Sequence, residues 1–330
     1  MPITPKSSIV PDGLPARQPL DRNGSARSKI FVTPVSIAAM RTFGDLRRLA
    51  HNAHVPILLE GESGSGKTIL ARWIHEHSPR SARPFQTVVL SALDDALAGP
   101  ALFGHTAGAF TDARHARAGA FASAAGGTLF LDEIGKASRS VQLKLLDALE
   151  TGEIQPIGAD KTHRVDVRIV VATNVPLADL VRDGLFLRDL WARLEAFRVH
   201  IPPLRERRAD IPLLVESAIR RLSPTFGYAK PPEVDDELMN AIRNAPWPLN
   251  IRELDTSLQR LLVDADGATP LTLEHCVGSL SWLRHSGIAK GPLTDARVDD
   301  AIARAGSITG AAKQLGVDRT TVHRHQRKRK

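Results

Sequence analysis

Directly after the apolar run 55–59, the chain contains the stretch Gly61-Glu62-Ser63-Gly64-Ser65-Gly66-Lys67-Thr68. Its spacing is G-x-x-x-x-G-K-[ST], and it stands between a predicted strand and a helix expected to begin near Thr68. In this pattern the glycines let backbone N–H groups fold around a phosphate, the ammonium of Lys67 reaches the β- and γ-phosphates, and the Thr68 hydroxyl can ligate Mg²⁺. These residues predict a loop that binds a nucleoside triphosphate; the alternative is a Gly-rich turn with a surface lysine.

A second motif lies further along the chain, where the apolar run 127–131 ends in two carboxylates, Asp132 and Glu133. Phosphoryl transfer uses one carboxylate to hold hydrated Mg²⁺ and another group to orient the attacking water. Asp132 fits the first role and Glu133 fits the second. Taken alone, such a strand end is more typical of a solvated turn. After a phosphate-binding loop, it predicts a nucleotide hydrolase.

Composition excludes several classes of protein. The 330 residues carry a formal charge of +8 and include one cysteine, Cys276. A single cysteine excludes an internal disulfide and a CxxC-type metal site, and it favours a reducing compartment. No apolar run approaches the ~20 residues that span a bilayer, and the N-terminus lacks the apolar segment of a signal peptide. We therefore expect a soluble cytoplasmic protein with no membrane partner.

The positive charge is concentrated at the two ends of the chain. Residues 313–330 contain seven basic side chains and one acidic one, and residues 1–30 contain five basic and two acidic ones. The long middle is therefore close to neutral. A basic end is typical of nucleic-acid contact, although many such tails are merely solvated.

Hydrophobic patterning predicts an α/β fold followed by a helical region. Strands are expected over residues 55–59, 85–90, 128–131, 168–172 and 197–201. Helical stretches alternate with them, including one that Ser138 can cap and Gly152 can end. This alternation predicts a parallel sheet covered by helices on both faces. Strand signals then stop, and helices are expected over residues 211–222, 235–245 and 251–263.

An ordered series of motifs resembles one family, the AAA+ bacterial enhancer-binding proteins of the NtrC type, which activate sigma-54 RNA polymerase. The motifs occupy residues 61–68, 102–113, 127–133, 168–174, 202–211 and 246–254. The resemblance implies an AAA+ P-loop NTPase with ATP and Mg²⁺ as cofactors. Composition and this resemblance together predict four parts: a disordered basic arm (1–30), an α/β ATPase subdomain (31–204), a helical lid subdomain (205–285), and a linker with a Fis-type helix-turn-helix (286–330).

The resemblance assigns roles to three further residues of the ATPase. Asn174 corresponds to the sensor-I polar residue, Arg252 to the sensor-II arginine of the lid, and Arg193 to an arginine finger that reaches ATP on a neighbouring subunit. The family therefore implies a ring, usually a homo-hexamer, or a hetero-oligomer with a related subunit. A cation supplied across an interface couples hydrolysis to assembly. For an arbitrary arginine, a surface or structural salt bridge is the alternative.

The resemblance also marks a loop that contacts sigma-54. This loop comprises Gly108, Ala109, Phe110, Thr111, Asp112 and Ala113. Asp112 replaces the usual glycine, which adds a charge and restricts φ. Three other departures are Val89, where the family commonly has an asparagine that restrains the catalytic glutamate, Leu187 in place of an interface arginine, and Leu249 in place of a glycine.

The basic C-terminus resembles a helix-turn-helix over residues 307–322, with Gly316 at the tight turn. The side chains expected to face enhancer DNA are Arg319, Thr320, Thr321, His323 and Arg324. Residues 327–330 are expected to touch phosphates; the alternative is a solvated basic helix. A metal site at His323 and His325 is disfavoured because no ligand is spaced to complete it. His75 and His77 are expected on a helix surface.

These features predict an ATP-dependent transcriptional activator that binds enhancer DNA and remodels the closed complex of sigma-54 RNA polymerase holoenzyme. With about 30 residues before the ATPase, we expect control through expression level, a separate antiactivator or co-activator, or a partner subunit. The rival prediction is a DNA-binding regulator in which ATP sets the oligomeric state without sigma-54 remodelling. Asp112 and Val89 favour that rival.

Overall fold

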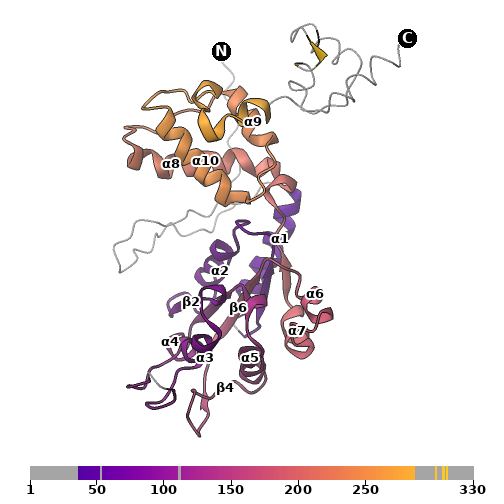
Figure 1. Cartoon of the computed structure of the whole chain (residues 1–330), viewed down its shortest axis with the longest axis vertical. Helices are drawn as coiled ribbons and strands as arrows, with labels where there is room; N and C mark the ends of the chain where they lie inside the picture. The colour runs from indigo at the N-terminus through magenta and orange to yellow at the C-terminus, as the bar shows by residue number, and fades with distance from the viewer. Residues whose placement is uncertain are drawn as a thin grey trace, which may run out of the picture. The chain divides into compact units, whose positions relative to one another are not determined.

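The computed structural model describes residues 36–286 except 53, 111 and 112, together with Ile302, Ser307, Ile308 and Gly310 (Figure 1). The basic arm predicted over residues 1–30 therefore lies outside the described residues, as does nearly all of the predicted helix-turn-helix. In the part of the chain that is described, no helix is long and apolar enough to cross a membrane.

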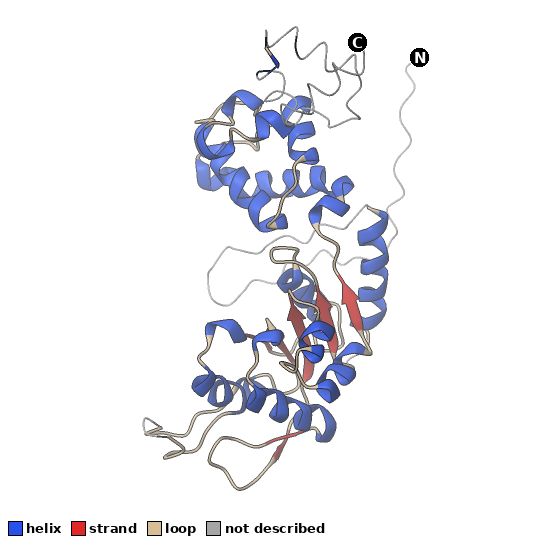
Figure 2. Cartoon of the chain, turned by 45° about the vertical axis from the view of Figure 1, so that its right-hand side comes forward, coloured by secondary structure: helices blue, strands red, loops and turns tan. Residues whose placement is uncertain are grey.

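A five-stranded parallel sheet forms the centre of the α/β part, with the strand order β2-β3-β6-β1-β7 (Figure 2). The strands are β1 (Ile57–Glu60), β2 (Phe85–Val89), β3 (Thr128–Asp132), β6 (Arg168–Thr173) and β7 (Arg198–His200). All five predicted strands are confirmed. Strand β1 begins two residues late, because Pro56 has no N–H to donate to a neighbouring strand.

Helices cover both faces of the sheet (Figures 1 and 2). They are α1 (Ile37–Ala50), α2 (Lys67–Glu76), α3 (Asp95–Phe103), α4 (Ala120–Ser123), α5 (Arg139–Thr151), α6 (Leu177–Arg182) and α7 (Arg188–Glu195). Successive residues of β3 enter different cores: Phe130 packs with α1 and α2, whereas Leu129 and Leu131 pack with α3 and α5. Burial on both faces is nearly complete in the three inner strands β1, β3 and β6, whereas the outer strands β2 and β7 retain exposed residues.

Helix α5 begins and ends as predicted, but its expected cap is wrong. Ser138 occupies the N-cap position without a capping hydrogen bond from its side chain, and its Oγ lies 3.1 Å from that of Ser140. Gly152, at φ +71°, ends the helix in the left-handed conformation that favours glycine. The apolar face is buried, and Gln142 is buried beside it.

The expectation that His75 lies on a helix surface is wrong. Its side chain is 5% exposed, and Nδ1 lies 3.0 Å from Thr128 Oγ1 on β3. His75 shares the buried face of α2 with Ala71, four residues earlier. Burial lowers the pKa of the imidazole. His77 does lie on the surface and stacks on Trp73, with ring centroids 4.0 Å apart.

The described chain from α8 onward is helical, as predicted. Its helices are α8 (Ile211–Leu222), α9 (Asp236–Asn244), α10 (Asn250–Asp264) and α11 (Leu283–Ser286). They enclose a separate apolar core in which the indole of Trp247 is 1% exposed and meets Trp282 edge to face. This second core gives the helical part its own source of stability.

A buried carboxylate joins the start of the α/β part to the start of the helical part. Asp210, which is 2% exposed, accepts hydrogen bonds from the Ser36 backbone N–H at 2.7 Å and from Ser36 Oγ at 2.9 Å. Ser36 also caps α1 by accepting from the N–H of Ala39. One short polar cluster therefore fixes the first turn of α1 and the residue that precedes α8.

A two-stranded antiparallel ribbon, β4 (Glu153–Ile154) with β5 (His163–Arg164), lies between α5 and β6. The sequence did not indicate these strands. Each is two residues long, and three of the four residues are exposed, so neither shows a hydrophobic pattern.

Candidate nucleotide site

The phosphate-binding loop (residues 61–68) connects β1 to α2, as predicted. Gly64 and Gly66 have φ values of +75° and +111°. A Cβ at Gly64 would lie 2.1 Å from the carbonyl oxygen of Leu249, so both conformation and space require glycine there. Leu249 itself is exposed and has an ordinary negative φ, so the departure at this position does not distort the turn.

The loop offers backbone donors for a phosphate. Within the described part of the chain, the N–H groups of Gly64, Gly66 and Lys67 have no hydrogen-bond acceptor. They lie at the N-terminus of α2, where the helix dipole favours negative charge. Donors without acceptors at a helix N-terminus fit a polyphosphate.

Lys67 lies at the base of this loop. Its side chain is 8% exposed, and Nζ donates to the carbonyl oxygens of Gly61 at 2.7 Å and Glu62 at 3.0 Å. Burial lowers the pKa of the ammonium, while the nearby charges of Asp132 and Glu133 raise it. The lysine is thus held at the loop with its charge balanced by the acidic end of β3.

Asp132 ends strand β3 next to Thr68. The Oδ1 atom of Asp132 accepts a hydrogen bond from the N–H of Glu133 at 3.0 Å, and the Thr68 hydroxyl is near enough to help lower the pKa of the Asp132 carboxyl group. Burial raises the pKa of Asp132, and the charge of Lys67 opposes this shift. A hydroxyl and a carboxylate beside a phosphate-binding loop are the oxygen donors that Mg²⁺ uses, so the residues fit the ion.

Glu133 has an unusual backbone conformation. Its φ of +58° and ψ of +47° place it in the left-handed region, which a residue with a long side chain seldom adopts. Such a conformation costs of order 1–3 kcal/mol and is typical of residues whose position serves a function. It distinguishes Glu133 from an ordinary surface glutamate.

The neighbouring strand supplies no polar restraint for this glutamate. Val89 is the register partner of Asp132 across β2 and β3, and its side chain is 40% exposed. A valine has no hydrogen-bonding group to offer the carboxylate of Glu133.

Asn174 follows β6, the strand that lies between β1 and β3. Its side chain is exposed, and the residue before it, Thr173, accepts a hydrogen bond from the Gly61 N–H at 3.2 Å. Because all three strands are parallel, their carboxyl ends place Asn174 at the same sheet edge as Lys67 and Asp132.

The lid reaches this edge through the first turn of α10. Arg252 donates from Nη1 to Ser63 Oγ at 2.8 Å. The candidate ATP-binding, Mg²⁺-binding and hydrolytic residues are therefore brought together, with one exception, Arg193.

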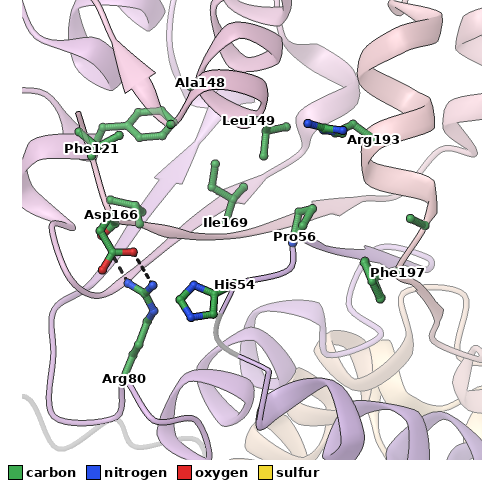
Figure 3. Close-up of a pocket in the computed structure, with 14 residues that line it drawn as sticks. His54, Pro56, Arg80, Phe121, Ala148, Leu149, Asp166, Ile169, Arg193 and Phe197 are labelled. Carbon is green, nitrogen blue, oxygen red and sulfur yellow. Dashed lines mark hydrogen bonds and ion pairs between the residues drawn. The ribbon is translucent and has the colours of Figure 1, made fainter. Parts of the chain in front are cut away.

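Arg193 lies on α7 at the opposite edge of the sheet. It lines a cavity of about 440 Å³ whose walls include the residues that precede β1, β6 and β7 (Figure 3). Arg80 and Asp166 form an ion pair of 2.5 Å on another side of this cavity. Arg193 is exposed and makes no ion pair with any residue that the structure describes. The phosphate-binding loop follows β1 and so lies at the other edge of the sheet from Arg193.

Two backbone hydrogen bonds join the described residues of the candidate sigma-54 loop. Gly108, at φ +80°, donates its N–H to the Ala113 carbonyl at 2.7 Å, and Ala113 donates to the Phe110 carbonyl at 2.9 Å. Phe110 is 37% exposed with its ring 4.9 Å from that of His105, whereas Ala113 is 4% exposed. Thr111 and Asp112 lie outside the described residues.

The same loop is tied to the segment between β4 and β5. The N–H of Thr106 donates to the Ile157 carbonyl at 3.0 Å. A Cβ on Gly158 would lie 2.8 Å from Ala109 Cβ. The loop therefore packs against a segment that the sequence did not link to it.

The motifs did not single out three polar residues that contact the outer side of the phosphate-binding loop. They are Arg205, Arg207 and Asn250, which donate hydrogen bonds to Glu62, Ser63 or Ser65. The available signal was their place inside two of the motifs, residues 202–211 and 246–254, and Asn250 is the first residue of α10.

A parallel sheet with this strand order, a phosphate-binding loop followed across the sheet by an acidic strand end, and a helical lid together define an AAA+ P-loop NTPase. Residues 35–200 match the family described as "Sigma-54 interaction domain", and residues 205–280 match "AAA+ ATPase lid domain". The chain belongs to the sigma-54 interaction domain family.

Individual relatives agree with this placement. The chain is 38% identical over 295 residues to the transcriptional regulatory protein XylR of Pseudomonas putida, covering 82% of this chain and 52% of the relative. It is 44% identical over 229 residues to the Nif-specific regulatory protein of Azotobacter vinelandii, covering 69% and 43%. The crystal structure of NtrX from Brucella abortus in complex with ATP matches with a TM-score of 0.67 and 29% identity, covering 90% and 68%. The chain thus spans about half the length of these two regulators.

Proposed function

We propose that this protein is an ATP-hydrolysing transcriptional activator that binds enhancer DNA and remodels closed complexes of sigma-54 RNA polymerase into open ones. The observation that carries the proposal is the convergence of Lys67, Asp132, Glu133 and Arg252 at one sheet edge, in a chain of the sigma-54 interaction domain family. Relatives named as transcription regulators support it.

Each group at this edge has a part in the chemistry. The N–H groups of the loop and Lys67 bind the phosphates of ATP, and Thr68 and Asp132 hold Mg²⁺, which neutralises charge on the transferred group. Glu133 orients and deprotonates the attacking water. In this proposal Asn174 contacts the γ-phosphate, and Arg252 brings the lid to the nucleotide.

Arg193 completes the site of another subunit. It is exposed, unpaired within the described residues and on the edge of the sheet away from its own loop. A ring, a homo-hexamer or a hetero-oligomer with a related subunit, brings such an arginine to a neighbour's γ-phosphate. An arginine finger supplied across an interface accelerates phosphoryl transfer by about 10³–10⁵.

Residues 108–113 are the proposed contact for sigma-54. Phe110 is an exposed apolar side chain on a turn, and such a side chain suits a protein contact better than water. Enhancer DNA is assigned to Arg319, Thr320, Thr321, His323 and Arg324, which lie outside the described residues. Cytoplasmic location and control by a separate antiactivator complete the proposal.

In vitro transcription from a sigma-54 promoter tests this function. With sigma-54 holoenzyme and ATP we expect open complexes, and with a non-hydrolysable ATP analogue or sigma-70 holoenzyme we expect none. Glu133→Gln should lose this activity, while Glu150→Gln, on the exposed side of α5, should keep it. Open complexes formed without hydrolysis, or by Glu133→Gln, would contradict the proposal.

Val89 favours the second candidate, a DNA-binding regulator in which ATP sets only the oligomeric state. Without a polar partner on β2, Glu133 lacks a restraint that could tie hydrolysis to remodelling. In that case ATP should promote assembly and DNA binding, but neither the natural chain nor its Asp112→Gly variant should activate sigma-54 promoters.

A further inference from the structure

Every residue of the phosphate-binding loop from Glu62 to Ser65 accepts a hydrogen bond from residues 205–207 or from the first turn of α10. The donors are Arg205 and Asn250 to Glu62, Asn250 and Arg252 to Ser63, the backbone N–H of Ile251 to Gly64, and Arg207 to Ser65. These bonds use side chains and carbonyl oxygens, so they leave the N–H groups of Gly64 and Gly66 for phosphate.

The carboxylate of Glu62 is fully engaged by this arrangement. Arg205 binds it through its two terminal nitrogens, with Nη1 donating to Oε2 at 2.8 Å and Nη2 to Oε1 at 2.6 Å. Asn250 Nδ2 donates to Oε2 at 3.1 Å. These hydrogen bonds, that of Arg205 first, lower the pKa of Glu62 to about 2. The group is therefore ionised at neutral pH, and its charge is turned toward the lid rather than the phosphates.

Asn250 joins three segments of the chain. It is fully buried; Nδ2 donates to Glu62 and to the Ser63 carbonyl at 3.0 Å, and Oδ1 accepts from the Leu204 N–H at 2.7 Å. Its φ of +55° is in the left-handed region, which asparagine tolerates better than most residues. Arg252 follows two residues later in the same helical turn.

We infer that Glu62, Arg205 and Asn250 form a lid latch, which holds the first turn of α10, and with it Arg252, against the phosphate-binding loop. The inference deepens the proposed function at its nucleotide site and rests on nucleotide binding there. Glu62 is accordingly a positioning residue, whose side chain does not touch ATP. The latch determines how long a nucleotide stays bound.

The latch acts on nucleotide affinity more than on the chemical step. Opening the lid removes Arg252 from the loop, whereas Lys67, Asp132 and Glu133 belong to the α/β part and keep their places. A bidentate, charge-assisted pair is stronger than an ordinary surface ion pair. We expect its loss to raise the Kd for ADP about 3- to 10-fold and to change kcat at saturating ATP less than about 3-fold.

A double-mutant cycle tests the pair directly. Fluorescent ADP binding is measured for the full chain and for Glu62→Gln, Arg205→Ala and the double variant. If the two groups act through each other, the double variant should bind ADP no more weakly than either single variant. Glu216→Gln is the matched control, because its 2.6 Å ion pair with Arg220 lies within α8 and away from the loop, and it should leave Kd unchanged.

The latch would be overturned if the losses of ADP affinity in the two single variants added up in the double variant. It would also be overturned if Glu62→Gln bound ADP more weakly while Arg205→Ala bound it normally, because Glu62 would then contact the nucleotide itself. Arg205→Lys keeps the positive charge but loses the bidentate guanidinium contact with Glu62. Its Kd for ADP should lie between those of the wild type and Arg205→Ala, and it can be measured even if the alanine variant folds poorly. Wild-type protein that shows latch-dependent ADP binding but no sigma-54 transcription would refute the proposed function alone. If the wild-type protein activates sigma-54 transcription but the effects of the two single variants on ADP affinity are additive, the latch alone would be refuted.

Discussion

Glu133 combines a functional carboxylate with a strained backbone. Its φ of +58° requires a conformation that glycine adopts freely and glutamate does not. The side chain follows Asp132 at the end of a buried strand, so the strain fixes the carboxylate at the sheet edge where the phosphate-binding loop also lies. The strained backbone at Glu133 lowers the stability of the fold, whereas hydrolysis requires the carboxylate that this residue supplies.

Replacing this residue should separate the two demands. We expect Glu133→Gly to raise the free energy of unfolding by about 0.5–1 kcal/mol, because it relieves the left-handed strain. Glu133→Gln should leave stability nearly unchanged. Both should lower ATP hydrolysis by about 10²-fold or more. Urea unfolding and a steady-state ATPase assay measure the two effects, and a destabilised glycine variant would contradict the strain argument.

His75 makes stability depend on pH. Burial lowers the pKa of its imidazole, so the folded state binds fewer protons than the unfolded state below the ordinary value of about 6.5. The contribution of His75 to the free energy of unfolding is complete at pH values above the ordinary imidazole pKa. It is lost as the pH falls from there toward the lowered pKa of the folded state. We expect His75→Gln to weaken the fall in stability between about pH 7.5 and 5.5.

The exposed neighbour provides the control for this prediction. The same urea-unfolding series on His77→Gln measures the effect of removing a surface imidazole, one that stacks on Trp73. Equal pH profiles for wild type and His75→Gln would show that the buried imidazole does not titrate between the two states.

Among single residues, the sequence predicted those whose role follows from a motif. Lys67, Asp132 and Glu133 meet at one edge because parallel strands end there, which spacing alone implies. The burial of His75 was not predicted, because it depends on the packing of α2 against β3. The same limit applies to Arg205 and Asn250, whose partner Glu62 lies far away in the sequence.

At the scale of elements, Gln142 fixes α5 to the segment that leads into α7. It is 1% exposed; Nε2 donates to the carbonyls of Ala137 at 2.8 Å and Leu185 at 3.0 Å, and Oε1 accepts from the Leu187 N–H at 2.8 Å. All of its polar groups are used. The position of α7, which carries Arg193, therefore depends on one buried amide.

Removing that amide should be costly. Gln142→Ala leaves the partly buried Leu187 N–H and two carbonyls without their partner, so we expect a loss of about 2–3 kcal/mol in the free energy of unfolding. Gln155→Ala removes a single exposed bond to the Ala159 carbonyl and should cost less than about 0.5 kcal/mol. Urea unfolding compares the two variants. Equal losses in the free energy of unfolding would contradict the role given to the buried amide of Gln142.

Long, buried elements were predictable and short polar ones were not. Short β-branched or apolar runs marked all five strands of the sheet, and the helices of the lid were expected where those strand signals stopped. The ribbon of β4 and β5 has no such pattern, so its packing against residues 104–109 could not be foreseen. Ser138 had the right place for a cap, but its hydroxyl pairs with Ser140 instead.

At the scale of the whole molecule, the two candidate catalytic centres, the loop at Lys67 and the arginine at 193, lie at opposite edges of one sheet. Lys67→Ala and Arg193→Ala should each abolish ATP hydrolysis. A mixture of the two variants should regain part of it, because some interfaces then pair an intact loop with an intact arginine.

The measurement is ATPase rate against mixing ratio at fixed total protein, with wild type alone as reference. A maximum at intermediate ratios supports action between subunits. A flat line of zero activity, with both variants still assembling with wild type, would contradict it.

The basic C-terminus permits a prediction that depends only on charge. Residues 327–330 are all basic. If they contact phosphates, truncation after residue 326 should reduce the slope of log K for DNA against log salt by about 3–4, with little loss of sequence preference. Fluorescence anisotropy over a salt series measures the slope. An unchanged slope would show that these residues are merely solvated.

The buried pair of Ser36 with Asp210 has a mechanical consequence. The chain enters α1 at Ser36, and the carboxylate that holds this residue directly precedes α8, the first helix of the lid. Loosening this pair would therefore free the first turn of α1 and the residue that precedes α8 together, because the two segments share one point of attachment.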